Sequence, residues 1–496
     1  MKNVTKYKRQ YFMPPVKCMK WAEKEYVDKA PVWCSVDLRD GNQALYSPMT
    51  TEEKIEFFKF LVKLGFKEIE VGFPAASHTE FEFVRRLIDE NLIPDDVTIQ
   101  VLTQAREHII KKTVEALKGA KNAIIHLYNS TSTLQREVVF RKSKEEIKQL
   151  AVDGAKLVMS LVDGQLDGNI RFEYSPESFT CTEPDYAAEV TNAVLDVFKP
   201  SETNKVIVNL PSTIEVATAN VYADQIEYMC KHLNNREHLV ISVHAHNDRG
   251  TGVASSELAL LAGADRVEGT IFGNGERTGN TDVITVALNM FCQGIDPELH
   301  LENIDEIIEV YEKYNRLPIN PRHPYAGEMA YVAFSGSHQD AIKKSMDKFG
   351  SSPSNKWANP YLTIDPTDIG RKYEPILINS QSGKGGVSYI MENKYGYTLP
   401  KPMLAEFSSL ITDMSDEKKT VLTNHEIHQA FKDTYVNVAE PIKTRFYRST
   451  EEDDCTILSA TIEKDGKVTS IEGKGNGPLD ALCNGLRQFL GQQFEI

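Results

Sequence analysis

Residues 32–40 read VWCSVDLRD, an apolar run that ends in the charged side chains of Asp37, Arg39 and Asp40. The apolar part is typical of a buried strand, whereas a strand that ends in solvent has no need for three charges. Similar apolar runs that end in polar residues recur seven more times, at residues 68–74, 98–105, 122–130, 170–177, 205–213, 239–248 and 266–274. Because all eight end this way, we interpret them as strands whose polar ends meet at one site.

Helical patterns separate these runs. Residues 50–65 open with threonines and acids, carry apolar residues at helical spacing and stop at Gly65, and residues 220–233 form another such segment. Nearly continuous apolar strands that alternate with helices indicate a parallel sheet covered by helices. Eight such units in about 250 residues predict an α/β fold of the (β/α)8 TIM-barrel type, with a doubly wound sheet as the alternative.

The strand–helix rhythm fades after about residue 285. Proline-rich residues 317–331 are typical of a linker, residues 408–435 have a helical pattern, and the tail from Thr444 has the pattern of three strands, a glycine loop and a helix. We therefore expect four parts. They are an N-terminal extension (1–30), the barrel (31–316), a mostly helical linker region (317–442) and an α+β C-terminal domain (443–496).

The composition of the chain indicates which classes of partner and which cellular compartment to expect. The 496 residues carry a net charge of −15 with no long basic run, which makes nucleic acid an unexpected partner. The seven cysteines are widely spaced without a CxxC pair, as is typical of reduced thiols in a cytosol. The N-terminus has no apolar core of a secretory signal, although its basic character leaves organelle targeting as an alternative, and no apolar run is long enough to span a membrane. We expect a cytoplasmic protein with no membrane partner.

A metal site is expected at the ends of the barrel strands, where barrel enzymes place their chemistry. His244 and His246 are two positions apart, so their rings project from the same face of a strand. With Asp40 they would form a two-histidine, one-carboxylate set that could bind a metal ion. The alternative is that one histidine simply forms a hydrogen bond with a neighbouring residue and no metal is bound. Arg39 either positions its loop or stabilises negative charge. His126, at another predicted strand end, is equally well explained as a core histidine.

Two glycine-rich segments are candidate phosphate sites. Residues 273–280, GNGERTGN, follow the eighth run, where barrels often hold phosphate, but the segment is not GxGxxG. Residues 383–386, GKGG, lack the Ser or Thr of a P-loop. A flexible turn is the alternative for both segments.

Several motifs together resemble those of the α-isopropylmalate synthases, members of the DRE-TIM metallolyase barrels. They are DLRDGNQ (37–43), VGFPAAS (71–77), YNSTS (128–132), EYSPE (173–177), VHAHND (243–248), GNGERTGN (273–280), FSGSHQDAIKKS (334–345), NSQSGKGG (379–386) and GNGPLDA (475–481). The first motif carries L-R-D, the variant of these synthases, where many relatives carry L-R-E. The motifs occur in order over almost the whole chain.

This resemblance implies an activity. Such enzymes condense acetyl-CoA with 2-oxoisovalerate and hydrolyse the thioester to give 2-isopropylmalate, the first committed step of leucine biosynthesis. The alternatives are a related enzyme on the same barrel (a citramalate synthase, a homocitrate synthase or a hydroxymethylglutaryl-CoA lyase type) and a non-catalytic metabolite sensor. A lyase is not expected to carry the long region after the barrel, and a sensor could have lost Glu177 or His338, both of which are present.

The resemblance also implies residue roles. A divalent metal (Mg²⁺, Mn²⁺ or Zn²⁺, with K⁺ as a further cation) would be held by Asp40, His244, His246 and Asn280. The keto-acid pocket would be formed by Leu102, His126, Ser175 and Thr213. The catalytic groups would be Arg39, Glu177, His338 and the weaker candidate Tyr361. Coenzyme A would approach Asn274, Gly275, Glu276 and Gly279.

The resemblance finally implies an assembly and a regulator. The family forms a domain-exchanged homodimer, so His338 is expected to serve the barrel of a second subunit. The family's C-terminal domain has two similar units with leucine bound between them, whereas the tail from Thr444 contains the pattern of one. We therefore expect a partial C-terminal regulatory domain of the leucine-binding type and a weak response to leucine.

Overall fold

The computed structural model describes residues 2–349, 356–371, 384–418, 421–436, 438, 441–452, 454–492 and 494. The chain divides into two compact units. The first comprises residues 1–331 with 363–373, and the second comprises residues 332–362 with 374–496. Each unit is described by itself.

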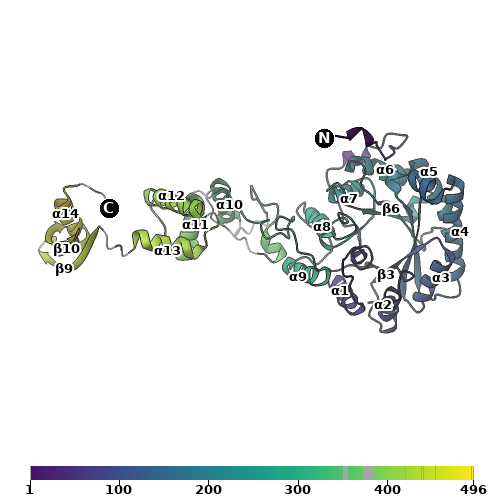
Figure 1. The fold of residues 1–496 in the computed structure, drawn as a ribbon, viewed down its shortest axis with the longest axis horizontal. Helices are drawn as coiled ribbons and strands as arrows, with labels where there is room; N and C mark the ends of the chain where they lie inside the picture. The colour runs from purple at the N-terminus through teal and green to yellow at the C-terminus, as the bar shows by residue number, and fades with distance from the viewer. Residues whose placement is uncertain are drawn as a thin grey trace. The chain divides into compact units, whose positions relative to one another are not determined.

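The first unit is built on eight parallel strands that close into a barrel (Figure 1). The strands are β1 (Val32–Ser35), β2 (Glu68–Gly72), β3 (Thr98–Gln104), β4 (Asn122–Ser130), β5 (Asn169–Glu177), β6 (Val206–Ser212), β7 (Leu239–Ala245) and β8 (Arg266–Gly269). They follow one another in chain order, and β8 pairs in parallel with β1 to close the ring. The prediction of a TIM barrel is therefore confirmed, and the doubly wound sheet is excluded.

Helices follow the strands around this barrel. They are α1 (Thr51–Lys63), α2 (His78–Asp89), α3 (Glu107–Ala116), α4 (Lys144–Val162), α5 (Pro184–Phe198), α6 (Ala219–His232), α7 (Gly252–Leu261), α8 (Val283–Phe291) and α9 (Ile304–Asn315). The first begins where the sequence indicates, because Thr50 and Glu53 form a capping box. It ends just before Gly65, whose φ of 98° suits glycine.

Three strands end three or more residues before their predicted carboxyl ends. The first stops at Ser35, and Asp37–Gly41 form a turn of π-helix, η3. The turn is anchored by the buried Asp37 carboxylate, which accepts hydrogen bonds from Ile271 N (3.1 Å) and Ser35 Oγ (2.8 Å). The seventh and eighth predicted strands likewise end early, at Ala245 and Gly269.

The second unit contains a helical part made of α10 (Gly336–Phe349), α11 (Lys384–Tyr395), α12 (Lys401–Lys418) and α13 (Asn424–Tyr435). The last three share a core that includes Met391, Phe407 and Phe431. The helical pattern at 408–435 therefore belongs to two helices, and Thr423 starts the second with a capping box. Of the predicted glycine motif at 379–386, residues 379–383 lie outside the described residues, and the rest begin α11.

The C-terminal part is a three-stranded antiparallel sheet with one helix. Strands β9 (Ile442–Glu452), β10 (Cys455–Lys464) and β11 (Lys467–Gly475) are ordered β11-β10-β9, and α14 (Pro478–Leu490) follows. Leu458, Ile462 and Ala481 are in its core. This confirms the strands, glycine loop and helix expected for the tail. Across the described ranges, no helix combines the length and the apolar character needed to cross a membrane.

Candidate active site and metal centre

A cavity of about 350 Å³ opens at the carboxyl ends of the barrel strands. It is lined by Arg39, Asp40, Gln43, Phe73, Leu102, His126, Tyr128, Ser175, Glu177, Asn209, Pro211, Thr213, His244, His246, Glu276 and Arg277. Most of the barrel residues that the sequence singled out are among these. The polar strand ends therefore meet around one pocket, as the sequence predicts.

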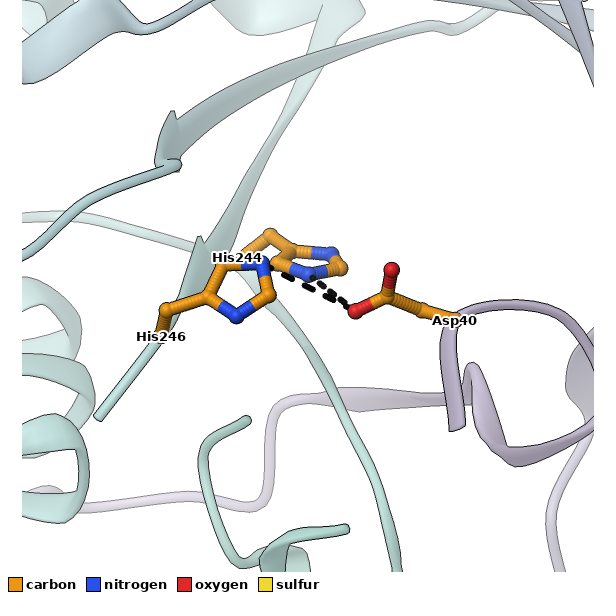
Figure 2. A group of neighbouring side chains, drawn as sticks. All are labelled: Asp40, His244 and His246. Atoms are coloured by element: carbon orange, nitrogen blue, oxygen red, sulfur yellow. Dashed lines mark ion pairs between the residues drawn. The ribbon is translucent and has the colours of Figure 1, made fainter. Parts of the chain in front are cut away.

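Asp40, His244 and His246 converge at this cavity (Figure 2). Asp40 comes from η3, His244 from β7 and His246 from the residue after β7. The Nε2 atoms of His244 and His246 lie 3.6 and 3.7 Å from Asp40 Oδ2. Both rings turn toward the same carboxylate, as the i, i+2 spacing predicts, although only His244 lies within the strand.

Asn280 completes this group from the β8 loop. Its side-chain Nδ2 donates to Asp40 Oδ2 (2.7 Å), and its Oδ1 lies 2.9 Å from His244 Nε2. The backbones of His246 and Asn280 form an isolated β-bridge, so the two residues lie directly opposite each other. The structure therefore brings together the four residues that the resemblance names as metal ligands.

The charges around Asp40 shift the pKa values of Asp40, His244 and His246 in different directions. Burial alone would raise the pKa of Asp40, but Arg39 and His244 outweigh it and hold that pKa well below its usual range. Burial and the neighbouring charge of His244 lower the pKa of His246 to about 4, so this imidazole is neutral at pH 7. Burial also opposes the charge on His244, but hydrogen bonds to Asp40 and Glu268 raise its pKa to about 9.

The donor set fits a divalent cation. One atom each from Asp40, His244 and His246 lies within 4.8 Å of the others, and all three residues are buried. Two imidazoles and one carboxylate with an open cavity beside them are a known arrangement for divalent transition metals. The Asp40 carboxylate and the neutral His246 ring offer lone pairs to such an ion.

A buried carboxylate behind the histidine orients it. Glu268 Oε2 lies 2.8 Å from His244 Nδ1, and its other oxygen accepts from Arg266 Nη1 at 2.6 Å. When Nδ1–H donates to Glu268, the Nε2 atom is the one that faces Asp40. Carboxylates in this position commonly fix the tautomer of metal-binding histidines.

The charged residues inside the barrel were missed by sequence reasoning. Arg266, with no exposed surface, also donates to Glu68 Oε2 (2.6 Å), Gln100 Oε1 (2.7 Å) and Ser242 Oγ (2.8 Å). The signal that could have revealed them is an alternation of charged residues inside predicted strands. It is visible as Glu68 and Glu70 in EIEVG and as Arg266 and Glu268 in RVEG.

Arg39 lies beside the metal group. Its Nη1 donates to Asp40 Oδ1 (2.8 Å), and its Nε pairs with the buried Glu70. Both readings of this residue fit the structure, because it positions Asp40 and also lines the cavity. His126 lies in the middle of β4 rather than at a strand end, which corrects its expected position.

His126 joins the pocket to the interior network. Its Nδ1 lies 2.9 Å from Glu70 Oε2, and its Nε2 lies 2.6 Å from Ser175 Oγ. The Ser175 hydroxyl also accepts from Asn209 Nδ2 at 3.0 Å. His126 is thus both a hydrogen-bonded core histidine and a wall of the cavity.

The glycine-rich loop after β8 mainly supports Asn280. A Cβ at Gly275 would lie 2.2 Å from Asn280 Nδ2, and Gly279 has a φ of 103°. Asn274 is buried and donates to Gly41 O at 3.0 Å. Among the four residues predicted to approach coenzyme A, Glu276 lines the cavity.

The last two predicted catalytic residues lie in the second unit. His338, in α10, stacks on Tyr361 with a distance of 4.0 Å between ring centroids and an angle of 27° between ring planes. The stacking places these two candidate residues next to each other.

Known proteins match the chain along its length. Residues 30–310 match the HMGL-like family, residues 328–392 the alpha-isopropylmalate synthase, post-catalytic domain-like family, and residues 421–496 the LeuA allosteric (dimerisation) domain. The 2-isopropylmalate synthase of Clostridium acetobutylicum is 55% identical over 501 residues, covering 98% of this chain and 90% of the relative. That of Helicobacter hepaticus is 54% identical over 504 residues, covering 100% and 90%.

Among solved structures, an HMG-CoA lyase from Bacillus subtilis covers 60% of this chain and 97% of its own, with 19% identity and a TM-score of 0.48. A Pseudomonas aeruginosa hydroxymethylglutaryl-CoA lyase has 19% identity and a TM-score of 0.47, and covers 58% of this chain and 92% of its own. These likenesses are too distant to bear on function.

Proposed function

The chain belongs to the 2-isopropylmalate synthases within the HMGL-like family, and from this premise we propose how its own residues carry out the reaction. The reaction condenses acetyl-CoA with 2-oxoisovalerate and hydrolyses the thioester, as the first committed step of leucine biosynthesis. One proton must leave the acetyl methyl group, and negative charge develops on the carbonyl oxygen that is attacked. The site must therefore supply a base, a positive environment and a pocket for the keto acid.

Asp40, His244, His246 and Asn280 are proposed to hold a divalent cation. The convergence of the two imidazoles on Asp40 beside the cavity is the observation that carries this proposal. The bound ion would act as a Lewis acid toward the oxygens of the keto acid. Mg²⁺, Mn²⁺ and Zn²⁺ are the candidates, and K⁺ is proposed as a further activating cation.

Arg39 is proposed to meet the negative charge of the reaction. Its guanidinium lines the cavity next to Asp40 and is held there by Glu70. A planar, permanently charged group on a fixed support stabilises developing oxyanion charge without having to reorganise.

The keto-acid pocket is proposed to have an apolar wall and a polar wall. Leu102, Tyr128 and Pro211 line the cavity with apolar surface that suits the isopropyl group of 2-oxoisovalerate. Ser175 and Thr213, with His126, offer polar atoms for the keto-acid end. Their hydrogen bonds to the surrounding strands limit how far they can turn, which supports a role in orienting the substrate.

Glu177, with His338 and the weaker candidate Tyr361, is proposed to remove the methyl proton. Glu177 lines the cavity, and its carboxylate would accept the proton as the new carbon–carbon bond forms. We propose that the His338 that completes the site comes from a second copy of the chain in a domain-exchanged homodimer. The match of residues 421–496 to a dimerisation domain supports an oligomer.

Acetyl-CoA is proposed to approach along the glycine-rich loop of residues 273–280, where Glu276 reaches the cavity. A CoA-release assay with 2-oxoisovalerate, pyruvate and 2-oxoglutarate tests the substrate. We expect turnover with 2-oxoisovalerate to exceed that with the other two. Equal or greater turnover with pyruvate or 2-oxoglutarate would favour a citramalate or homocitrate synthase, and no turnover would favour a sensor.

The expected division of the chain is retained as a proposal, with parts at 1–30, 31–316, 317–442 and 443–496. Residues 443–496 are proposed to act as part of a leucine-binding regulatory domain, which the LeuA match supports. A leucine titration of turnover, paired with calorimetric leucine binding, tests this role. Saturable leucine binding with inhibition of turnover would support this role, and the absence of both would contradict it.

A further inference from the structure

Glu177, the last residue of β5, lies directly opposite Ser130, the last residue of β4, in the register of the two strands. The Ser130 hydroxyl donates a hydrogen bond to Glu177 Oε2. Among the described residues, no other side chain donates to this carboxylate. Ser130 is itself buried, with 7% of its surface exposed, so its hydroxyl is held at a fixed place beside the cavity.

The backbone that follows Glu177 is also held. Thr131 donates to the Glu177 carbonyl oxygen from its backbone N (3.1 Å) and from its Oγ1 (3.3 Å). The next residue, Ser178, has φ 60° and ψ 38°, a left-handed conformation that is uncommon for a residue other than glycine. Its N–H donates to Thr213 Oγ1 at 2.9 Å, which supports the sharp turn. Strain of this kind is often found at functional sites.

We propose that Ser130 is a positioning residue for Glu177. A glutamate side chain has three rotatable bonds, and the backbone contacts fix only where that side chain begins. The hydrogen bond from the Ser130 hydroxyl fixes the position of one carboxylate oxygen, Oε2. The other oxygen, Oε1, is then available to accept the methyl proton of acetyl-CoA. The inference rests on the proposed role of Glu177 as base, and it adds a residue that the proposed function above does not use.

The geometry of proton transfer gives the expected size of the effect. A misplacement of a reacting group by about 1 Å can cost on the order of 100-fold in rate. Without the hydroxyl, Glu177 would still be present but would sample several rotamers. We therefore expect turnover to fall by about 10- to 100-fold while keto-acid binding, which does not use this carboxylate, changes less than about twofold.

The sharpest test compares Ser130→Thr with Ser130→Val, because the two side chains have nearly the same shape and only Thr has a hydroxyl. The metal-loaded chain is assayed for kcat with acetyl-CoA and with trideuterated acetyl-CoA, and 2-oxoisovalerate binding is measured by calorimetry. We expect Ser130→Thr to keep most of the turnover. Ser130→Val should lose turnover and show a larger isotope effect, because methyl deprotonation becomes slower relative to the other steps. Equal kcat and isotope effect in the two variants would overturn the inference.

Glu177→Gln, run in parallel, separates this inference from the proposed function. If Glu177→Gln loses turnover and Ser130→Val matches Ser130→Thr, the base assignment stands and the positioning role is wrong. If Glu177→Gln keeps its turnover, the base assignment itself is wrong and the inference falls with it. Loss of turnover in both Glu177→Gln and Ser130→Val, with Ser130→Thr active, is the result that the structure predicts.

Discussion

Replacing Arg266 with Met should destabilise the barrel strongly. Arg266 is fully buried and donates to Glu268 and Glu68, each at 2.6 Å, and to two further polar side chains. Glu68 would keep its second partner, Arg171, at 2.6 Å. Glu268, with no exposed surface, would lose its arginine and would keep His244 as its nearest charged partner.

The magnitude follows from this loss. Removal of one partner of a buried ion pair typically costs about 3–5 kcal/mol, because the remaining charge is left without compensation in a medium of low polarity. A change of 1 kcal/mol shifts the melting temperature by about 2–4 °C in domains of 150–250 residues. We therefore expect Arg266→Met to lower the melting temperature by roughly 10 °C.

The assay is differential scanning calorimetry at one scan rate, with Arg86→Met as the control. Arg86, on α2, makes two ion pairs at the surface, with Glu52 (2.7 Å) and Glu90 (2.6 Å). Surface ion pairs contribute little to stability, so the control should melt close to the unmodified chain. A melting temperature for Arg266→Met that matches Arg86→Met would refute the reasoning, because it would mean that Glu268 does not need its arginine.

Further predictions concern the site and its support. Glu268→Gln removes the charge behind His244 and should weaken binding of the divalent metal by about 10- to 100-fold in calorimetry, and unchanged affinity would contradict that role. His338→Ala should lower kcat by about 100- to 10,000-fold with little change in keto-acid binding, and near-normal turnover would show that His338 is structural only. Burial raises the pKa of Asp37 to about 7 from 3.8, so its protonated form stabilises the folded chain below pH 4, and this contribution is lost as the pH rises through 7. Between pH 5 and pH 8, the melting temperature of the unmodified chain should therefore fall relative to that of Asp37→Asn. A difference between the two melting temperatures that stays constant over this range would show that Asp37 is not protonated in the fold.

Much of the barrel could be predicted because local patterns determine it. The eight strands were located from apolar runs, and the helix at Thr51–Lys63 from its cap and its glycine stop. The strand ends could not be predicted, because contacts distant in sequence decide them. Asp37 accepts from Ile271 N across 234 positions, and His246 bridges to Asn280.

The group around Asp40 could be predicted because its residues stand in recognisable motifs. The same-face rule brought His244 and His246 to Asp40, and the structure agrees. The contribution of Glu268 and Arg266 to the site could not be predicted, because a charged residue inside a strand interrupts the apolar pattern by which strands are recognised. Their role depends on partners from other strands, and a barrel interior can bury charges only when those partners are present.

The most direct test of the account is a calorimetric metal titration of the chain after chelator treatment. Mn²⁺ and Zn²⁺ are titrated separately into the unmodified chain, into His246→Ala and into the control His78→Ala, whose side chain is exposed at the surface. We predict one divalent ion per chain in the unmodified protein and the control, and loss of that binding in His246→Ala with an unchanged melting temperature of the metal-free chain. Binding of His246→Ala with the same stoichiometry and affinity as the unmodified chain would contradict the assignment of Asp40, His244 and His246 as the metal centre.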